Sequence, residues 1–303
     1  MPQTKANGLI LEYDVRGRPD DPAVLLIMGL GAQMIRWSPA FVDKIAARGL
    51  RVIRFDNRDI GLSEKCEAAG PPDMPAIIAA LMAGNSVPAA YTLSDMAADA
   101  VGVLDALGVA RAHIVGASMG GMIAQIVAAD YSERTLSLTS IMSTSGHPDL
   151  PRATPAAMAV LNERGPDPRT DLEGYLDHMV RGAKVIGSPG YPVADAELRA
   201  QVKSYFERCY YPLGFMRQYA AVVASPERRP KLATITAPTV VIHGQDDPLV
   251  PVTGGRDTAA HIPGADLRVI PGMGHDIPPA LYDTIVEGIA SAVSRADAAR
   301  KAA

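Results

Sequence analysis

The stretch Ala112-His-Ile-Val-Gly-Ala-Ser-Met-Gly120, followed by Gly-Met-Ile-Ala-Gln-Ile-Val-Ala-Ala, decides the fold of this chain. Its apolar beginning predicts a buried strand and its end predicts a helix, so Gly116 to Gly120 must turn sharply between them. A serine at such a turn is held in a strained conformation above the sheet, and only small flanking residues let the backbones pass. We therefore interpret Ser118 as a candidate nucleophile supported by Gly116 and Gly120. The alternative is a glycine-rich turn that only tightens packing.

A nucleophilic serine needs a base that takes its proton, so a histidine is expected further along the chain. Among the six histidines, His275 has the best setting, because it lies in the loop Pro271-Gly-Met-Gly-His-Asp276 directly after the last predicted strand. His113 and His243 lie within or at the end of predicted strands, which favours core residues or backbone partners. The other three have no comparable setting. The spacing of His, Cys and acidic residues indicates no metal, and no cofactor is implied.

The imidazole in turn needs an acid that fixes its tautomer and stabilises its charged form. Asp246 and Asp247 both follow the predicted strand Thr239-Val-Val-Ile-His243, in a loop at its carboxyl end. We favour Asp247, three residues past the glycine, and interpret Asp246 as a solvated turn residue. The chain order Ser118, Asp247, His275 places three separate loops at one sheet edge, as a serine hydrolase triad requires.

A developing oxyanion needs two preorganised backbone donors. The amide of Met119 follows the nucleophile directly and is the first candidate. The second is expected in the loop after the predicted strand 23–28, where Gly29-Leu30-Gly31 offers Leu30 as the best donor. Gly29 is then a supporting residue, a role that is compatible with simple turn formation.

Composition bounds the class of protein. Of 303 residues, 48% are hydrophobic and 20% are charged, as in an ordinary globular protein. The net charge of −4 argues against a nucleic-acid partner, because phosphate binding depends on clustered Lys and Arg. The amino-terminal residues lack the apolar core of a signal peptide, and glycines and polar residues interrupt the nearest candidate membrane span, 113–129. A cytoplasmic location follows by default, with Cys66 and Cys209 as thiols rather than a lone disulfide.

Strand and helix patterns alternate along most of the chain. Asn7-Gly8 predicts a hairpin turn before an extended segment at 9–15. Apolar runs typical of buried strands follow at 23–28, 51–55, 113–116, 136–142, 239–243 and 267–270. Helices are expected at 37–48, from Ser94 as N-cap to 107, at 120–131, at 252–261, and from 278 to a frayed tail at 295–303.

The alternation fails between His147 and Lys231, where helical patterns are punctuated by prolines and no convincing buried strand occurs. Elsewhere it predicts an α/β class, with a doubly wound, mostly parallel, eight-stranded sheet. The helical stretch is then inserted after the sixth strand as a cap. The expected domains are a core of residues 1–146 and 232–303 and a cap of residues 147–231.

With these residues the chain resembles the α/β-hydrolase family over nearly its whole length. The turn at residues 116–120, which carries Ser118, matches the family's nucleophile elbow. In addition, the segment Arg54-Phe-Asp-Asn-Arg-Asp-Ile-Gly-Leu-Ser63 is similar to the family's segment after the second parallel strand. We call residues 29–31 the oxyanion loop. The resemblance implies that this loop is supported by Asp56, Arg58, Gly61 and Ser63.

Within the family, Met28-Gly-Leu-Gly31 followed by Trp37, and then Val52-Ile-Arg-Phe-Asp-Asn-Arg-Asp59, is similar to the group containing anthracycline methyl esterases. That resemblance implies a carboxylic or methyl ester as substrate, without specifying an anthracycline. Met28 replaces the histidine that commonly precedes this glycine in the family, so the backbone donor is kept and that side chain is not. Ser118 argues against the epoxide-hydrolase and haloalkane-dehalogenase branches, which need a carboxylate nucleophile.

The sequence therefore predicts a serine carboxylesterase that acts on a small-molecule ester through an acyl-enzyme, without cofactor or metal. Lactone hydrolysis, carbon–carbon bond hydrolysis and cofactor-free perhydrolysis are alternatives on the same triad, since they differ in pocket shape and water access. A ligand receptor built on a hydrolase fold is an alternative from another class. A scaffold protein would give no reason for three catalytic-type loops to coincide.

Overall fold

The sheet is the centre of the molecule. The computed structural model describes residues 2–85 and 87–302, and these form an eight-stranded sheet in the order β1-β2-β4-β3-β5-β6-β7-β8. The first two pairings, β1 with β2 and β2 with β4, are antiparallel, and all the others are parallel. The predicted fold class is confirmed. The strands are β1 (Gln3–Ala6), β2 (Leu9–Arg16), β3 (Ala23–Ile27), β4 (Arg51–Phe55), β5 (Ala112–Ala117), β6 (Thr135–Ile141), β7 (Thr239–Gly244) and β8 (Asp266–Ile270).

The β1–β2 hairpin has the predicted turn. Ala6 pairs with Leu9, and Asn7 and Gly8 between them have φ values of 48° and 84°. Positive φ at both central residues is what a type I′ turn requires, and Asn-Gly tolerates it best.

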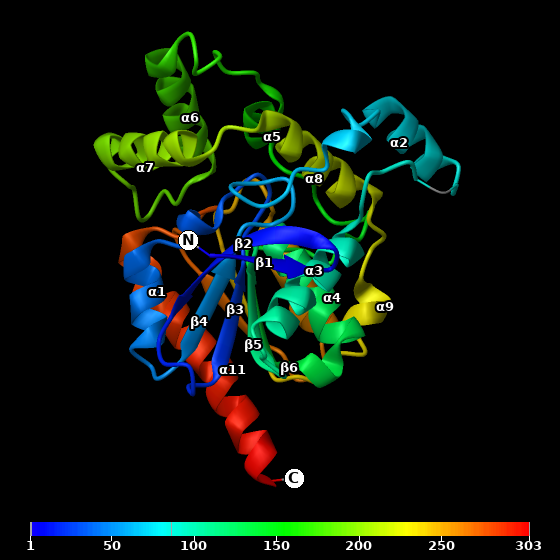
Figure 1. Ribbon diagram of the computed structural model, residues 1–303, viewed down its shortest axis with the longest axis vertical. Helices are drawn as coiled ribbons and strands as arrows, with labels where there is room; N and C mark the ends of the chain where they lie inside the picture. Colours follow the sequence, from blue (N-terminus) through cyan, green and yellow to red (C-terminus); the bar gives the residue numbers. More distant parts are fainter. Residues whose placement is uncertain (1, 86, 303) are drawn as a thin grey trace.

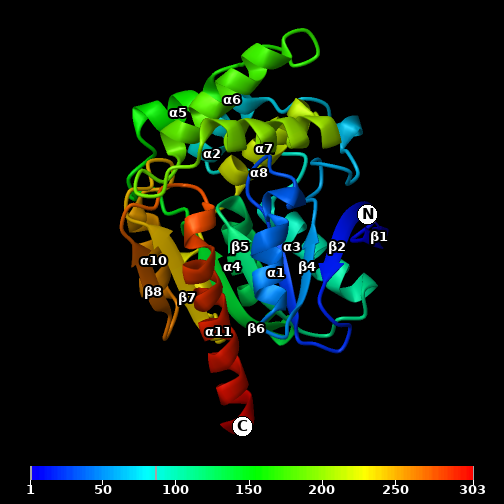
Figure 2. The same ribbon diagram turned by 90° about the vertical axis from the view of Figure 1, so that its left-hand side faces the viewer.

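Two apolar layers cover the sheet, one on each face. All residues of β3 are buried, because each face of a central parallel strand packs against helices. Helices α3 (Leu93–Ala106) and α4 (Met119–Asp130) cover one face, and α1 (Pro39–Ala46) and α11 (Tyr282–Ala302) cover the other. Figures 1 and 2 show these layers from two sides, with α11 extending below the sheet to the carboxyl terminus. Helix α10 (Val252–His261) lies against β7.

The segment between β6 and β7 is helical, as predicted, and we call it the helical insertion. In both views most of its helices lie above the edge of the sheet at which the parallel strands end (Figures 1 and 2), whereas α9 (Arg229–Leu232) lies lower, beside α4 (Figure 1). The helices above the edge are joined there by α2 (Met74–Met82), which contacts α8 and which the sequence analysis missed. The insertion contains α5 (Pro155–Asn162), α6 (Leu172–Ile186), α7 (Asp195–Arg208), α8 (Pro212–Ala224) and α9 (Arg229–Leu232).

Three predicted helix ends are wrong. The N-cap of α3 is Thr92 rather than Ser94, because Thr92 and Asp95 form a reciprocal capping box. The helix predicted over 37–48 is shorter, since the Ser38 hydroxyl caps α1 by accepting from Phe41 N. The tail is helical up to 302 rather than frayed, and it is anchored at its start, where Arg295 donates to the carbonyls of Thr239 and Gly264. Ala303 lies outside the described residues.

Candidate active site

The turn from β5 into α4 is as tight as the sequence predicts. Ser118 has φ 55° and ψ −121°, a conformation that non-glycine residues rarely adopt. A Cβ on Gly116 would overlap the backbone of Gly120, and a Cβ on Gly120 would overlap the carbonyl of Ile27. The turn is fixed from outside by Ser143, whose hydroxyl donates to the Ser118 carbonyl at 2.9 Å. Close backbone packing therefore holds the strained serine at the end of β5.

His275 lies between the serine and an aspartate. Its Nε2 is 2.9 Å from Ser118 Oγ, and its Nδ1 is 2.7 Å from Asp247 Oδ2. Its own amide donates to the carbonyl of Ile186 at 2.7 Å. The helical insertion therefore holds the loop of residues 271–276, which we call the histidine loop. The structure thus brings together the three residues that the sequence proposes as a triad. With Nδ1–H donated to the carboxylate, Nε2 presents a lone pair to the serine hydroxyl.

Asp247 is held as a charged acceptor. Its Oδ1 accepts from Leu249 N at 2.9 Å and from Val250 N at 2.8 Å. Burial on its own would raise the pKa of this carboxyl, but His275, His243 and the Val250 amide lower the pKa to about 2. Asp246 is exposed, and its carboxylate accepts from the Gly272 amide at 2.7 Å.

His243 is a neighbour of Asp247, and the sequence analysis expected it to be a core residue or a backbone partner. It is fully buried, with Nε2 2.8 Å from the Val250 carbonyl and 3.6 Å from Asp247 Oδ2. The spacing of four residues before Asp247, across the end of β7, is the signal that could have linked the two. His113, the other strand histidine, is buried against Ser137 away from this cluster.

Two backbone amides near Ser118 are available for an oxyanion. Among the described residues, neither Leu30 N nor Met119 N donates to a protein acceptor. The amide of Gly31, by contrast, donates to Gln218 Oε1 at 2.9 Å. Gly29 lies against the serine, because a Cβ on it would be 3.1 Å from Ser118 Cβ. Leu30, where the sequence analysis places the second donor, therefore has an amide that donates to no protein acceptor among the described residues.

The segment after β4 contacts the chain on both sides of the loop 29–31, through the expected Asp56 and through Asn57, which the sequence analysis did not name as a supporting residue. Asp56 Oδ1 accepts from Met34 N at 2.7 Å, and Asn57 Nδ2 donates to the Met28 carbonyl at 2.9 Å. The Arg58 side chain does not reach the loop, since it pairs with Asp99. Gly61 and Ser63 contact Asp56 and not the loop. A Cβ on Gly61 would overlap the Asp56 carboxylate, and Ser63 Oγ donates to the Asp56 carbonyl at 2.6 Å.

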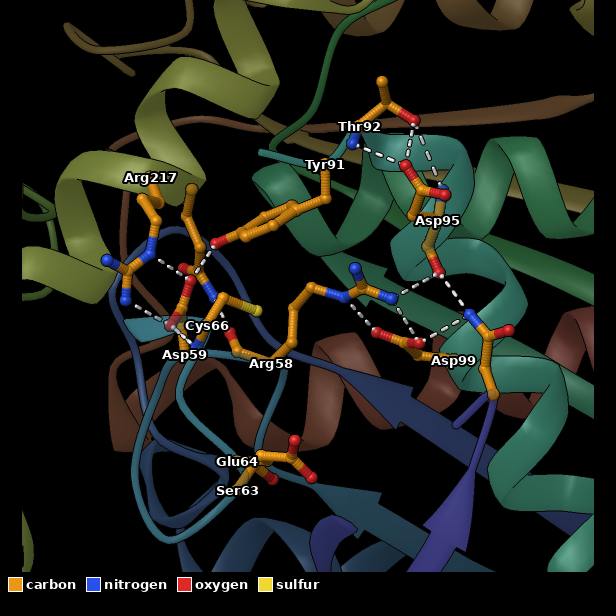
Figure 3. A network of polar contacts seen from close by, with 12 residues as sticks. Arg58, Asp59, Ser63, Glu64, Cys66, Tyr91, Thr92, Asp95, Asp99 and Arg217 are labelled. Carbon is orange, nitrogen blue, oxygen red and sulfur yellow. Dashed lines mark hydrogen bonds and ion pairs between the residues drawn. The ribbon is translucent and has the colours of Figure 1, made fainter. Parts of the chain in front are cut away.

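A buried ionic network lies beside this segment, and no local sequence pattern indicates its long-range partners. Arg217 of α8 donates to both oxygens of Asp59, at 2.8 and 2.6 Å. The Tyr91 hydroxyl donates to Asp59 at 2.7 Å, and Arg58 turns the other way toward Asp99 (Figure 3). Burial would raise the pKa of Asp59, but the bonds from Arg217, the Cys66 amide and Tyr91 lower it.

Residues 2–85 and 87–302 contain neither a candidate metal site nor a membrane-spanning helix. In that part of the chain, no group of three or more His, Cys, Asp or Glu residues could hold a metal ion. Nor does any described helix have the length and apolar character needed to cross a membrane. Cys66 and Cys209 are free thiols.

The fold and the Ser-His-Asp arrangement define a class of hydrolase. The model of the family described as "alpha/beta hydrolase fold" matches residues 22–278, and the chain belongs to this family. The chain is therefore a hydrolase, as predicted.

Several known proteins of this family are similar to the chain. The chain is 29% identical over 290 residues to rhodomycin D methylesterase DnrP of Streptomyces peucetius, covering 90% of this chain and 91% of the relative. It is 28% identical to a 2-hydroxy-6-oxononadienedioate hydrolase of Burkholderia vietnamiensis, covering 88% and 85%. The enol-lactonase of Burkholderia xenovorans LB400 shares the fold, with a TM-score of 0.70, 22% identity and coverage of 97% and 100%. The resemblance to methyl esterases is confirmed, and the methylesterase relative supports ester bonds as the bonds that the chain cleaves.

Proposed function

We propose that this protein is a serine carboxylesterase that hydrolyses a small-molecule carboxylic ester, with methyl esters as the first class to test. Ser118 is the nucleophile, His275 the base and Asp247 the acid of the triad. The observation that carries the proposal is the pair of hydrogen bonds that joins His275 to Ser118 Oγ and to Asp247 Oδ2, at 2.9 and 2.7 Å. This order of contacts lets a proton pass from the hydroxyl to an imidazole whose charged form a carboxylate stabilises.

The reaction is two-step acyl transfer. His275 takes the proton of Ser118 as Oγ attacks the ester carbonyl, and the amides of Leu30 and Met119 donate to the resulting oxyanion. The alcohol then leaves with the proton from His275. A water molecule, activated by the same imidazole, attacks the acyl-enzyme and releases the carboxylic acid. The methylesterase relatives support the ester, and no step requires a metal or cofactor.

The helical insertion, residues 147–231, is proposed as a cap domain on a core of residues 1–146 and 232–303. Its position above the carboxyl ends of the parallel strands supports this division, because ligands of open α/β sheets bind at that edge (Figure 2). The cap residues would then form the walls that distinguish one ester from another.

The test is hydrolysis of p-nitrophenyl acetate, butyrate and octanoate, together with titration of acid released from methyl butyrate. We expect Ser118→Ala to lower kcat by at least about 10³-fold, since the nucleophile is lost. Ser94→Ala, on the exposed surface of α3, is the matched control and should keep full activity. Equal turnover by the wild-type protein and Ser118→Ala on every ester would refute the esterase proposal. A lactone in the same assay then tests the alternative substrate on this triad.

A further inference from the structure

Gln218 of α8 contacts two parts of the site at once. Its side chain is fully buried, and Oε1 accepts from the Gly31 amide at 2.9 Å. Its Nε2 donates to the carbonyl of Arg58, also at 2.9 Å. A backbone N–H on one side and a carbonyl on the other fix which end of the carboxamide faces which partner. Both hydrogen bonds join the helical insertion to residues more than 150 positions earlier in the chain.

The backbone of α8 is held against the segment that carries Arg58. The neighbouring Arg217 forms two hydrogen bonds with Asp59, and neither side chain is exposed. A Cβ on Gly214 would overlap the Asp59 carbonyl, so the helix lies directly on that backbone. Gln218 is therefore anchored on a rigid support and not on a flexible surface.

The oxyanion loop is held at both ends. Asn57 donates to the Met28 carbonyl at 2.9 Å, and the loop turns through a bond from Ala32 N to the Gly29 carbonyl at 3.2 Å. At the far end, Gly31 has φ +67° and its amide is taken by Gln218. Because that bond fixes the peptide between Leu30 and Gly31, it limits the direction of the preceding amide.

We propose that Gln218 is a positioning residue for the oxyanion hole: it holds the Leu30–Gly31 peptide so that Leu30 N faces the reacting carbonyl. The inference rests on the proposed esterase function. An oxyanion donor acts mainly in the transition state, so loss of its alignment lowers kcat and leaves KM nearly unchanged. The helical insertion would then take part in catalysis as well as in substrate selection.

The test compares Gln218→Met, which keeps the length and removes both hydrogen bonds, with Gln218→Glu, which keeps an acceptor for the Gly31 amide. We expect kcat on p-nitrophenyl butyrate to fall about 10- to 100-fold in Gln218→Met, less than the loss of a whole donor. Gln218→Glu should retain more activity, and KM should stay within about 2-fold of wild type. Inhibition by a trifluoromethyl ketone, which forms an oxyanion on Ser118, should weaken by the same factor as kcat/KM falls.

The control is Gln3→Met, an exposed residue of the edge strand β1 outside the site, which should leave kcat unchanged. Thermal unfolding identifies folded variants, and Gln218→Leu, which also removes both hydrogen bonds, replaces Gln218→Met if that variant is unstable. A folded Gln218→Met or Gln218→Leu variant with wild-type kcat and inhibitor affinity would overturn the inference, as would a loss confined to KM. Ser118→Ala keeps the two proposals apart. If it abolishes activity while the Gln218 variants behave as wild type, only the positioning role fails.

Discussion

Asp246 and Asp247 are adjacent carboxylates with different surroundings, and the difference gives a prediction at the scale of the residue. Asp247 contacts His275 and two backbone amides, whereas Asp246 is exposed. We expect Asp247→Asn to lower kcat by about 10⁴-fold, because the amide cannot hold the required imidazole tautomer. Asp246→Asn, the matched control, should stay within about 2-fold of wild type. The measurement is steady-state hydrolysis of p-nitrophenyl butyrate by both variants, and equal losses would contradict the assignment.

The same pair of variants separates catalysis from stability. The pKa of Asp247 is lowered from 3.8 to about 2 in the folded protein. Its ionised form therefore stabilises the fold above about pH 4, and this contribution of about 2 kcal/mol is lost as the pH falls through the folded pKa. Asp247→Asn lacks the titration, so its free energy of unfolding should change less than that of wild type between about pH 5 and pH 2. Urea unfolding at each pH measures the difference, with Asp246→Asn following wild type.

At the scale of the element, the strand–turn–helix around Ser118 depends on glycines for space. Gly116→Ala should destabilise the protein by about 3 kcal/mol or more, because the new methyl group meets the backbone of Gly120 and neither element can move freely. Gly108→Ala is the matched control: Gly108 has φ +65° but open space around it. It should cost only about 1 to 2 kcal/mol of backbone strain. Chemical denaturation of both variants tests this, and equal costs would show that packing at the elbow is loose.

The elements that the sequence predicts well are those whose pattern is local. The apolar run of β3, the Asn7-Gly8 turn and the glycines around Ser118 each carry their structure within a few residues. The start of α3 was mispredicted although its signal is local, because the capping box of Thr92 and Asp95 was overlooked in favour of Ser94. The tail of α11 has partners that no local pattern shows, since Arg295 donates to the carbonyls of Thr239 in β7 and of Gly264. Helix α2 was missed because its uncharged, nearly all-apolar sequence has no helical periodicity, although Ile77 is buried.

At the scale of the whole molecule, the helical insertion is bonded to two of the site's loops. It binds the histidine loop through Ile186 and Gly190, whose partners are His275 N and the Gly272 carbonyl. It binds the oxyanion loop through Gln218. These contacts join residues about 80 to 190 positions apart in the sequence, so no local sequence pattern predicts them. The sequence could therefore propose the triad from three loops, but not the surrounding contacts that hold those loops in place.

The Arg217–Asp59 pair joins the insertion to the core, and its burial leads to the last prediction. Both side chains have no exposed surface, so removal of one leaves the other charged and unpaired in a medium that solvates it poorly. Arg217→Met should lower the free energy of unfolding by about 3 to 5 kcal/mol. Asp59→Asn, whose side chain suits the φ of 70° at this position, should also destabilise the fold.

The double variant decides whether the pair acts as a unit. With both charges removed, no buried ion is left without a partner, so its loss of stability should be smaller than the sum of the two single losses. Urea unfolding of the four proteins gives the coupling energy, and an m-value equal to wild type in each confirms that the insertion still unfolds with the core. Strict additivity would mean that water reaches the site and screens the charges. A lower m-value in Arg217→Met would mean that the insertion separates from the core before the core unfolds.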